Sequence, residues 1–133
     1  MDQGDECQGQ AGDADYSIRV AAGIGAFTPD EWNGFAGTTR GDKENGYNPL
    51  VSFAFLGALE DSGCAVRRTG WQGHHLRLET ARGKLLGAVP CYLKSHSQGE
   101  YVFDHGWSDA FERVGGRYYP KLQCAVPFTP VTG

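Results

Sequence analysis

The sequence lacks any apolar run approaching the ~18 consecutive residues that a membrane-spanning helix needs. It also lacks a signal peptide, because its first 15 residues contain no lysine, no arginine and no apolar segment. We therefore expect a cytoplasmic protein with no membrane span. Residues 1–14 are polar and acidic, and we expect them to form a disordered tail before a domain at 15–133.

An excess of positive charge is also missing. Twelve Lys and Arg residues stand against 16 Asp and Glu residues, for a net charge of −4. This balance argues against nucleic-acid binding through bulk charge, although it does not exclude a local basic groove. The four cysteines form no C-x-x-C pair, so no metal site is predicted, and reduced, mostly buried thiols are favoured. They are Cys7, Cys64, Cys91 and Cys124.

The chain of 133 residues is long enough for one domain, or for part of one. Hydrophobic periodicity and turn residues predict an α/β or α+β order with a hairpin in the middle and no internal repeat. The expected elements are a strand at 16–22, helices at 29–36 and 50–62, strands at 75–80, 84–94 and 101–103, a helix at 108–114 and a strand at 122–128.

Local signals support several of these elements. Thr28-Pro29 and Asn48-Pro49 each combine a capping residue with a first-turn proline. Trp32 and Phe35 are spaced to face the core, and the 50–62 helix is apolar enough to be buried on more than one side. Pro90 lies inside an apolar run, where a bulge or an unpaired site is expected because proline donates no hydrogen bond.

Asp104-His105 is the first candidate for chemistry, since a carboxylate can tune a neighbouring imidazole into a general base. Adjacent strand residues point to opposite faces, so Asp109 or Glu112 could be the partner of His105 instead. The competing interpretation is structural: Asp104 or Ser108 caps the following helix, and His105 is a turn residue.

A second group of polar and aromatic residues lies at strand ends and in loops, where ligand sites of open sheets are found. Its members are Lys94, His96, Tyr101, Tyr118, Tyr119 and Lys121. An ordinary amphipathic rim explains them equally simply. The pair His74-His75 alternates across a strand, so the two rings cannot chelate one metal together, and a structural role is favoured.

Three stretches carry a family resemblance: NPLVSFAFLGALEDSG, GWQGHHLRLE and the run from GKLLGAVPCYLK to PFTPVTG. From about Asn48 to Gly133 the chain resembles the FemAB-like predicted N-acyltransferases, bacterial proteins labelled peptidoglycan biosynthesis or recognition. That family is similar in fold to GNAT acyltransferases, is commonly duplicated and runs well beyond this length. The resemblance implies the N-terminal part of a GNAT-like domain: a mixed, mainly antiparallel sheet flanked by helices.

The resemblance also implies a site. The donor would lie beside Phe128, Thr129, Val131, Thr132 and Gly133. The resemblance transfers no catalytic assignment, and our own hypothesis is that His105 or Asp104 is the catalytic base, because the acceptor amine must lose a proton. The acceptor, a small molecule or peptidoglycan precursor, would contact Lys94, His96, Tyr101, Trp107, Tyr118, Tyr119 and Lys121. The donor would be acyl-CoA or an aminoacyl-tRNA, with no tightly bound cofactor. The usual glycine-rich GNAT phosphate loop is absent before Gly133, so the type of donor stays open.

Two functions compete at this point. The first is a fragment of an enzyme that transfers an acyl or aminoacyl group to an amine. The second is a non-catalytic GNAT-like module that binds a cell-wall precursor or a protein through exposed Trp71, Trp107, Tyr118 and Tyr119. An isolated piece of such a sheet would be inactive and prone to self-association through its open edge.

Overall fold

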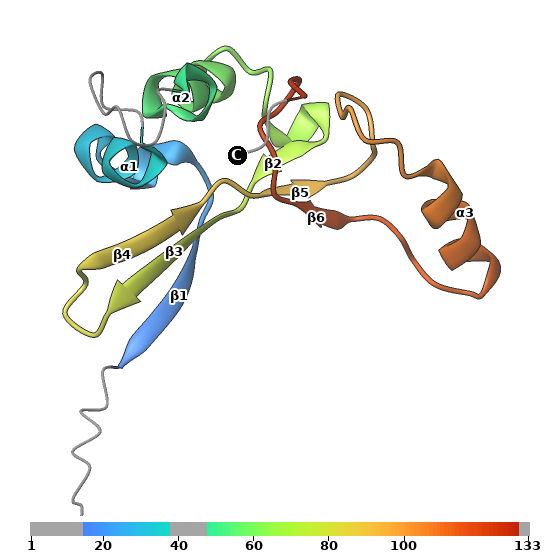
Figure 1. The fold of residues 1–133 in the computed structure, drawn as a ribbon. Coiled ribbons are helices and arrows are strands. Elements are labelled where there is room, and N and C mark those ends of the chain that lie inside the picture. Colours follow the sequence, from blue (N-terminus) through green and yellow to red (C-terminus); the bar gives the residue numbers. More distant parts are fainter. Residues whose placement is uncertain (1–14, 38–47, 131–133) are drawn as a thin grey trace, which may run out of the picture.

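The computed structural model describes residues 15–37 and 48–130, and these form an α+β fold (Figure 1). The described residues contain three α-helices and two antiparallel three-stranded sheets, which confirms the predicted class and is consistent with a GNAT-like arrangement. The helices are α1 (Pro29–Ala36), α2 (Phe53–Asp61) and α3 (His105–Arg113). The strands are β1 (Tyr16–Ala21), β2 (Trp71–Gly73), β3 (His75–Thr80), β4 (Leu85–Val89), β5 (Tyr92–Lys94) and β6 (Lys121–Gln123).

One bent hairpin builds both sheets. β3 and β4 pair in the first sheet, of order β1-β3-β4, while β2 and β5 pair in the second, of order β2-β5-β6. Where the hairpin passes between sheets, the His74 N–H donates to the Cys91 carbonyl at 2.8 Å. The predicted continuous strand at 84–94 is therefore wrong: it breaks at Pro90–Cys91, because Pro90 has no N–H for the ladder.

Gly73 permits the bend. A side-chain Cβ at this position would lie 2.3 Å from the Ala22 carbonyl oxygen, so only glycine lets the end of β2 pass under the segment that leaves β1. Close backbone approach explains why a glycine interrupts an otherwise aromatic and polar stretch.

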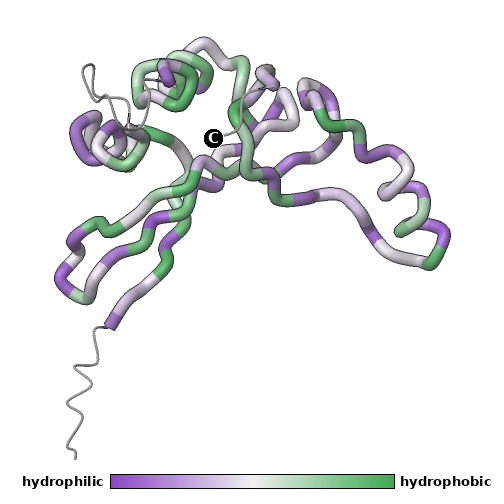
Figure 2. Tube along the Cα trace, viewed as in Figure 1, coloured by the Kyte–Doolittle hydropathy of each residue, from purple (hydrophilic) through white to green (hydrophobic). Residues whose placement is uncertain are grey.

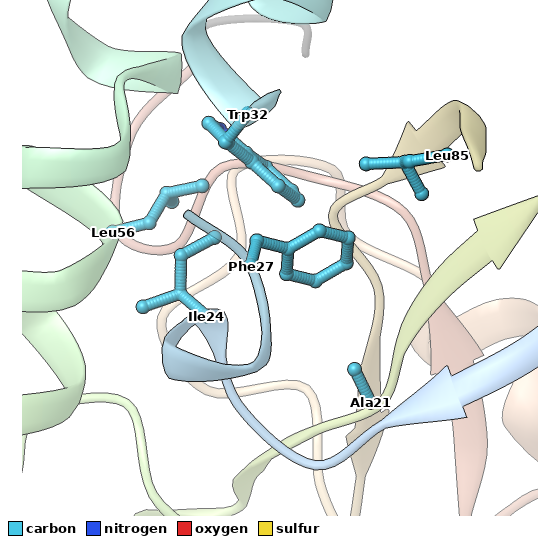
Figure 3. Close-up of a cluster of buried hydrophobic side chains, with 6 residues drawn as sticks. All are labelled: Ala21, Ile24, Phe27, Trp32, Leu56 and Leu85. Atoms are coloured by element: carbon cyan, nitrogen blue, oxygen red, sulfur yellow. The ribbon is translucent and has the colours of Figure 1, made fainter. Parts of the chain in front are cut away.

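The helix α1 packs on β4 and against α2, and the core lies where these helices meet the first sheet (Figure 3). Trp32 is buried against Phe27, and its indole N–H donates to the Val51 carbonyl at 2.9 Å. One burial prediction is wrong, since Phe35 is 48% exposed. In α2, Leu56 is fully buried in this core, and Leu59 packs against a second cluster, formed by Ala65, Trp71 and Tyr92, as expected of a helix buried on more than one side. The core residues are Ala21, Ile24, Phe27, Trp32, Leu56 and Leu85.

Strand residues alternate in polarity, as Figure 2 shows. The face of the first sheet that the helices leave uncovered carries apolar side chains in register, with Ile18 opposite Leu78 and Val20 opposite Leu76. Ile18 is 69% exposed. On the opposite face of the sheet, Arg19 and Arg77 pair with the Glu79 carboxylate.

Capping residues set the helix ends. Thr28 and Glu31 form a capping box at the start of α1, as the Thr-Pro signal predicts, and Gly37 ends the helix in the left-handed conformation. The second helix begins later than predicted. Asn48-Pro49 starts a short 3-10 turn, and the Ser52 hydroxyl caps α2. The predicted tail at 1–14 lies outside the described residues, as do residues 38–47.

A buried hydrogen-bonded pair fastens α2 to the hairpin. His75 is fully buried, and its Nε2 lies 2.8 Å from Glu60 Oε1 while its Nδ1 accepts the Cys91 N–H. The imidazole therefore carries its proton on Nε2 and donates it to Glu60. The same carboxylate accepts the N–H of Ile24, so one side chain of α2 satisfies donors from two other segments.

Replacing Glu60 with alanine should therefore destabilise the fold. Each of the two donors left without an acceptor costs about 1–3 kcal/mol, which predicts a loss of about 2–6 kcal/mol in the free energy of unfolding. Urea denaturation measures this loss. Glu60→Gln keeps an acceptor and should lose less, and Asp61→Ala, at the exposed neighbouring position, is the control. A Glu60→Ala variant as stable as Asp61→Ala would contradict this account of the pair.

Candidate functional site

A long excursion separates β5 from β6 and projects from the rest of the molecule (Figure 1). Residues 95–104 lead outward, α3 forms its far part, and residues 114–120 return to the second sheet. We call this segment, residues 95–120, the arm. The predicted strand at 101–103 is wrong, since these residues form bends, and α3 begins at His105, earlier than the predicted residue 108.

Lys121 holds the two ends of the arm together. Its ammonium group donates to Ser97 Oγ at 3.0 Å and to Glu100 Oε2 at 2.7 Å, and it also contacts Asp104 Oδ2. Burial alone would lower the pKa of Lys121, but these hydrogen bonds to Asp104 and Glu100 raise it above its ordinary value. The cation therefore stays charged and anchors both carboxylates.

Tyrosines complete this polar cluster. The Tyr118 hydroxyl donates to Asp104 at 2.7 Å, and the Tyr119 hydroxyl lies 2.6 Å from Ser97 Oγ. Burial would raise the pKa of Asp104, but hydrogen bonds from Lys121, Ser97 and Tyr118 outweigh it and hold that pKa well below its usual value. Asp104 occupies the position before α3, yet its carboxylate makes no capping hydrogen bond to that helix.

Lys94 is the second cation of the cluster, and it is fully buried. Its ammonium group lies 3.5 Å from the centroid of the Trp71 ring and donates to the Gln98 carbonyl at 3.0 Å. Burial lowers the pKa of Lys94 to about 8, an effect that the nearby Glu100 carboxylate only partly offsets. Lys94 is thus a buried amine that can lose its proton close to neutral pH.

A cavity of about 480 Å³ opens beside this cluster. The Glu100 carboxylate and Trp71 form one side, and the segment that follows β6 forms the other, at Cys124–Val126, Thr129 and Pro130. Glu100 Oε1 and Trp71 Nε1 are buried and have no hydrogen-bond partner. Glu100 Oε1 lies 3.8 Å from Lys94 Nζ, which is too long for a hydrogen bond. Two residues that line the cavity therefore each carry a buried polar atom without a hydrogen-bond partner.

Phe128 lines a second cavity, of about 370 Å³, which shares Trp71 and Gly99 with the first. The Phe128 and Trp71 rings lie 5.3 Å apart, and Phe128 has a φ of 61°, which is rare for a bulky residue. Gly99 has a positive φ, and a Cβ there would clash with the Phe128 ring at 2.6 Å. The predicted site residue His96 lines the second cavity, where its Nδ1 accepts the Gln98 N–H.

The structure brings together five of the residues predicted to form the site: Lys94, Asp104, Tyr118, Tyr119 and Lys121. Others lie apart from this cluster. His105 is exposed and stacks on Phe103 at 6.2 Å, and Trp107 is 77% exposed on α3. Tyr101 borders the larger cavity but is itself 60% exposed.

The predicted donor residues lie only partly within the described chain. Thr129 lines the larger cavity, and Phe128 lines the smaller one. Val131, Thr132 and Gly133 lie outside the described residues. The strand predicted at 122–128 is shorter than expected: β6 ends at Gln123, and the chain then turns away from the ladder toward Pro127.

Sequence reasoning missed three residues of the site. Glu100 and Ser97 were treated as ordinary loop residues, yet both bind Lys121. Trp71 was expected to be exposed, but it is 1% exposed beneath Lys94. The one available signal was that Glu100 is an acidic residue between two lysine-bearing strands.

Three cysteines, Cys64, Cys91 and Cys124, lie among the described residues. Cys91 is buried, but Cys64 and Cys124 are exposed, so the expectation of mostly buried thiols is wrong. Across residues 15–37 and 48–130, no three His, Cys, Asp or Glu side chains are grouped to hold a metal ion. No helix within these ranges has the length and apolar character to span a membrane.

Comparison with known proteins gives one family. A family model described as FemAB_like, peptidoglycan biosynthesis/recognition, matches residues 23–133. This match covers both sheets apart from β1, all three helices and the whole arm. No curated protein and no solved structure matches the chain.

The lowered pKa of Lys94 predicts a pH dependence of stability. In the unfolded chain a lysine titrates near 10.4. Between about pH 8 and that value, the unfolded state still holds the proton that folded Lys94 has lost, so this residue adds stability as the pH rises.

The measurement is the free energy of unfolding of the wild type minus that of Lys94→Met. This difference should increase from pH 8 to pH 10. Lys84→Met, at an exposed position, is the matched control and should show no such increase. If the free energies of unfolding of the wild type and Lys94→Met changed in parallel with pH, the lowered pKa of Lys94 would be contradicted.

Proposed function

Since this chain belongs to the FemAB-like family of peptidoglycan biosynthesis and recognition, we propose that it transfers an acyl or aminoacyl group to an amine of a cell-wall precursor. Involvement in peptidoglycan biosynthesis or recognition follows from the family itself. The transfer reaction is our proposal, and the cavity beside Glu100 is where we assign it.

The observation that carries this proposal is the unpaired Glu100 Oε1. Its partner oxygen Oε2 is fixed by Lys121 at 2.7 Å, so the carboxylate cannot rotate freely to find other donors. Oε1 is buried and has no hydrogen-bond partner, in a residue that lines the cavity. A buried carboxylate oxygen in this state favours a donor from a ligand, and an acceptor amine in its ammonium form supplies one.

Proton removal from the acceptor follows from the same geometry. An ammonium group has no lone pair, so it must lose a proton before it attacks an acyl carbon. We assign Glu100 as the group that receives this proton. Lys94 Nζ lies 3.8 Å from the same oxygen and can hold the proton afterwards in the molecules in which Lys94 has lost its own. The roles predicted for His105 and Asp104 stay predictions. The ion pair of Asp104 with Lys121 makes that carboxylate a weak base.

The opposite wall suits the acyl donor. Ala125, Val126 and Pro130 give it an apolar surface, and the chain there has left the β-ladder. Backbone N–H groups of such a splayed segment are suitable donors to the oxyanion of the tetrahedral intermediate. Acyl-CoA and aminoacyl-tRNA remain the two candidate donors. A cytoplasmic location, a tRNA-borne donor and self-association through a sheet edge likewise stay predictions.

The test is an amine-acylation assay on the chain and on any longer gene product that contains it, with acyl-CoA and aminoacyl-tRNA offered side by side. Glu100→Gln keeps the size of the side chain and the hydrogen bond to Lys121 but cannot take up a proton. Loss of general-base catalysis typically lowers turnover by about 10²–10⁴-fold. Asp61→Asn, away from the cavity, is the control and should leave turnover unchanged.

His105→Ala belongs in the same assay, because it tests the base predicted from the sequence. Turnover that falls in His105→Ala but not in Glu100→Gln would contradict our assignment. If no variant and no donor gives turnover, while a muropeptide binds and Trp71 fluorescence changes, the non-catalytic binding module becomes the better description.

A further inference from the structure

Two cysteines face each other where β5 and β6 begin to separate. The register pairs Lys94 with Lys121, Leu93 with Leu122 and Tyr92 with Gln123. One step further along both strands, this register places Cys91 opposite Cys124. Residues directly opposite each other in an antiparallel pair have Cα atoms about 4.5–5.5 Å apart, within the about 4.4–6.8 Å that a disulfide spans.

The two thiols also lie close enough to affect each other, because the Cys124 side chain helps to raise the pKa of the Cys91 thiol. Both cysteines are reduced. Their surroundings differ, because Cys91 is 1% exposed whereas Cys124 is exposed and borders the cavity described above. Burial, and then the nearby Cys124 side chain, raise the pKa of the Cys91 thiol to about 11.

We propose that Cys91 and Cys124 form a reversible disulfide on exposure to a peroxide, and that this bond is a redox modification site in the wall of the cavity. The inference rests on the strand register, the closeness of the two thiols and the unequal exposure of the two cysteines. It stands whether or not the chain catalyses acyl transfer.

The chemistry balances with a peroxide as the oxidant. The exposed Cys124 thiolate attacks one peroxide oxygen and becomes a sulfenic acid, and with hydrogen peroxide the other oxygen leaves as water. The Cys91 sulfur then attacks the Cys124 sulfur, the S–S bond forms, and the sulfenic oxygen leaves as a second water. A dithiol reductant returns both thiols by exchange. Because Cys91 is a poor thiolate near neutral pH, its attack is expected to be the slower step.

The bond would change the cavity. Cys124 lies on the wall formed by the segment after β6, opposite Glu100. Cys91 is held in place by two backbone hydrogen bonds, from its N–H to His75 and to its carbonyl from His74. The disulfide would therefore pull Cys124 toward a fixed point at the bend of the hairpin.

Peptide mapping after oxidation tests the proposal. Reduced protein is treated with hydrogen peroxide, remaining thiols are alkylated, and the protein is digested with trypsin without reductant. We expect the peptide 85–94, which contains Cys91, joined to the peptide that begins at Leu122, which contains Cys124. The linked species should have lost two hydrogens and should disappear after dithiothreitol.

Variants give the controls. Cys64→Ser, which removes the other exposed cysteine, should still form the link, whereas Cys91→Ser should stop oxidation at a Cys124 sulfenic acid that dimedone labels. The proposal is overturned if wild-type protein, folded by circular dichroism, yields Cys124 sulfinic acid or links through Cys7 or Cys64 in place of the Cys91–Cys124 peptide.

Discussion

The bend of the central hairpin is the constraint on which the structure depends. At this point the chain must break two β-ladders and still satisfy their backbone groups. It does so with the His74 N–H donated to the Cys91 carbonyl and the Cys91 N–H donated to the buried His75 ring. His75 in turn donates to Glu60, which ties α2 to the bend. One polar connection thus joins the helical layer, the first sheet and the second sheet.

The same bend places the candidate site. The chain continues from β4 into β5, which belongs to the second sheet. Lys94, at the end of β5, therefore lies opposite Trp71 of β2 on one side and Lys121 of β6 on the other. Two lysines and two carboxylates gather there, so their formal charges cancel within a largely buried cluster. Buried charges are tolerated only when they are paired, and the arm supplies both carboxylates. The arm is therefore fixed at its base by the residues that border the cavity.

Local signals made much of the fold predictable. The Thr28 capping box, the alternation around Leu76 and the glycine stop after α3 all lie within a few residues of the elements they define. Pro90 also indicated an irregularity, but the sequence could not show that the strand there changes sheet. Phe35 was predicted to face the core but is largely exposed, because helical spacing identifies an apolar face but not how much of that face a neighbouring element covers.

The site was less predictable, because its members meet only through tertiary structure. Lys94, Asp104 and Lys121 were chosen for their residue type, but Glu100 and Ser97 carry no motif and became significant only when the arm folded back on Lys121. The Asp104-His105 pair shows the opposite case. The two residues are neighbours in sequence, but Asp104 pairs with Lys121 whereas His105 stacks on Phe103. Chemistry that depends on long-range pairing cannot be inferred from spacing alone.

The central claim is that ligands bind in the cavity between Glu100 and the segment after β6. The three tryptophans report on it separately by NMR of their indole N–H groups. Trp32 is hydrogen-bonded in the core, Trp107 is exposed on α3, and Trp71 Nε1 is unpaired at the cavity. Titration with a muropeptide amine, an acyl-CoA and an aminoacyl-tRNA should shift the Trp71 indole resonance and leave that of Trp32 in place. A shift confined to Trp107, or no shift at saturating ligand, would contradict the account.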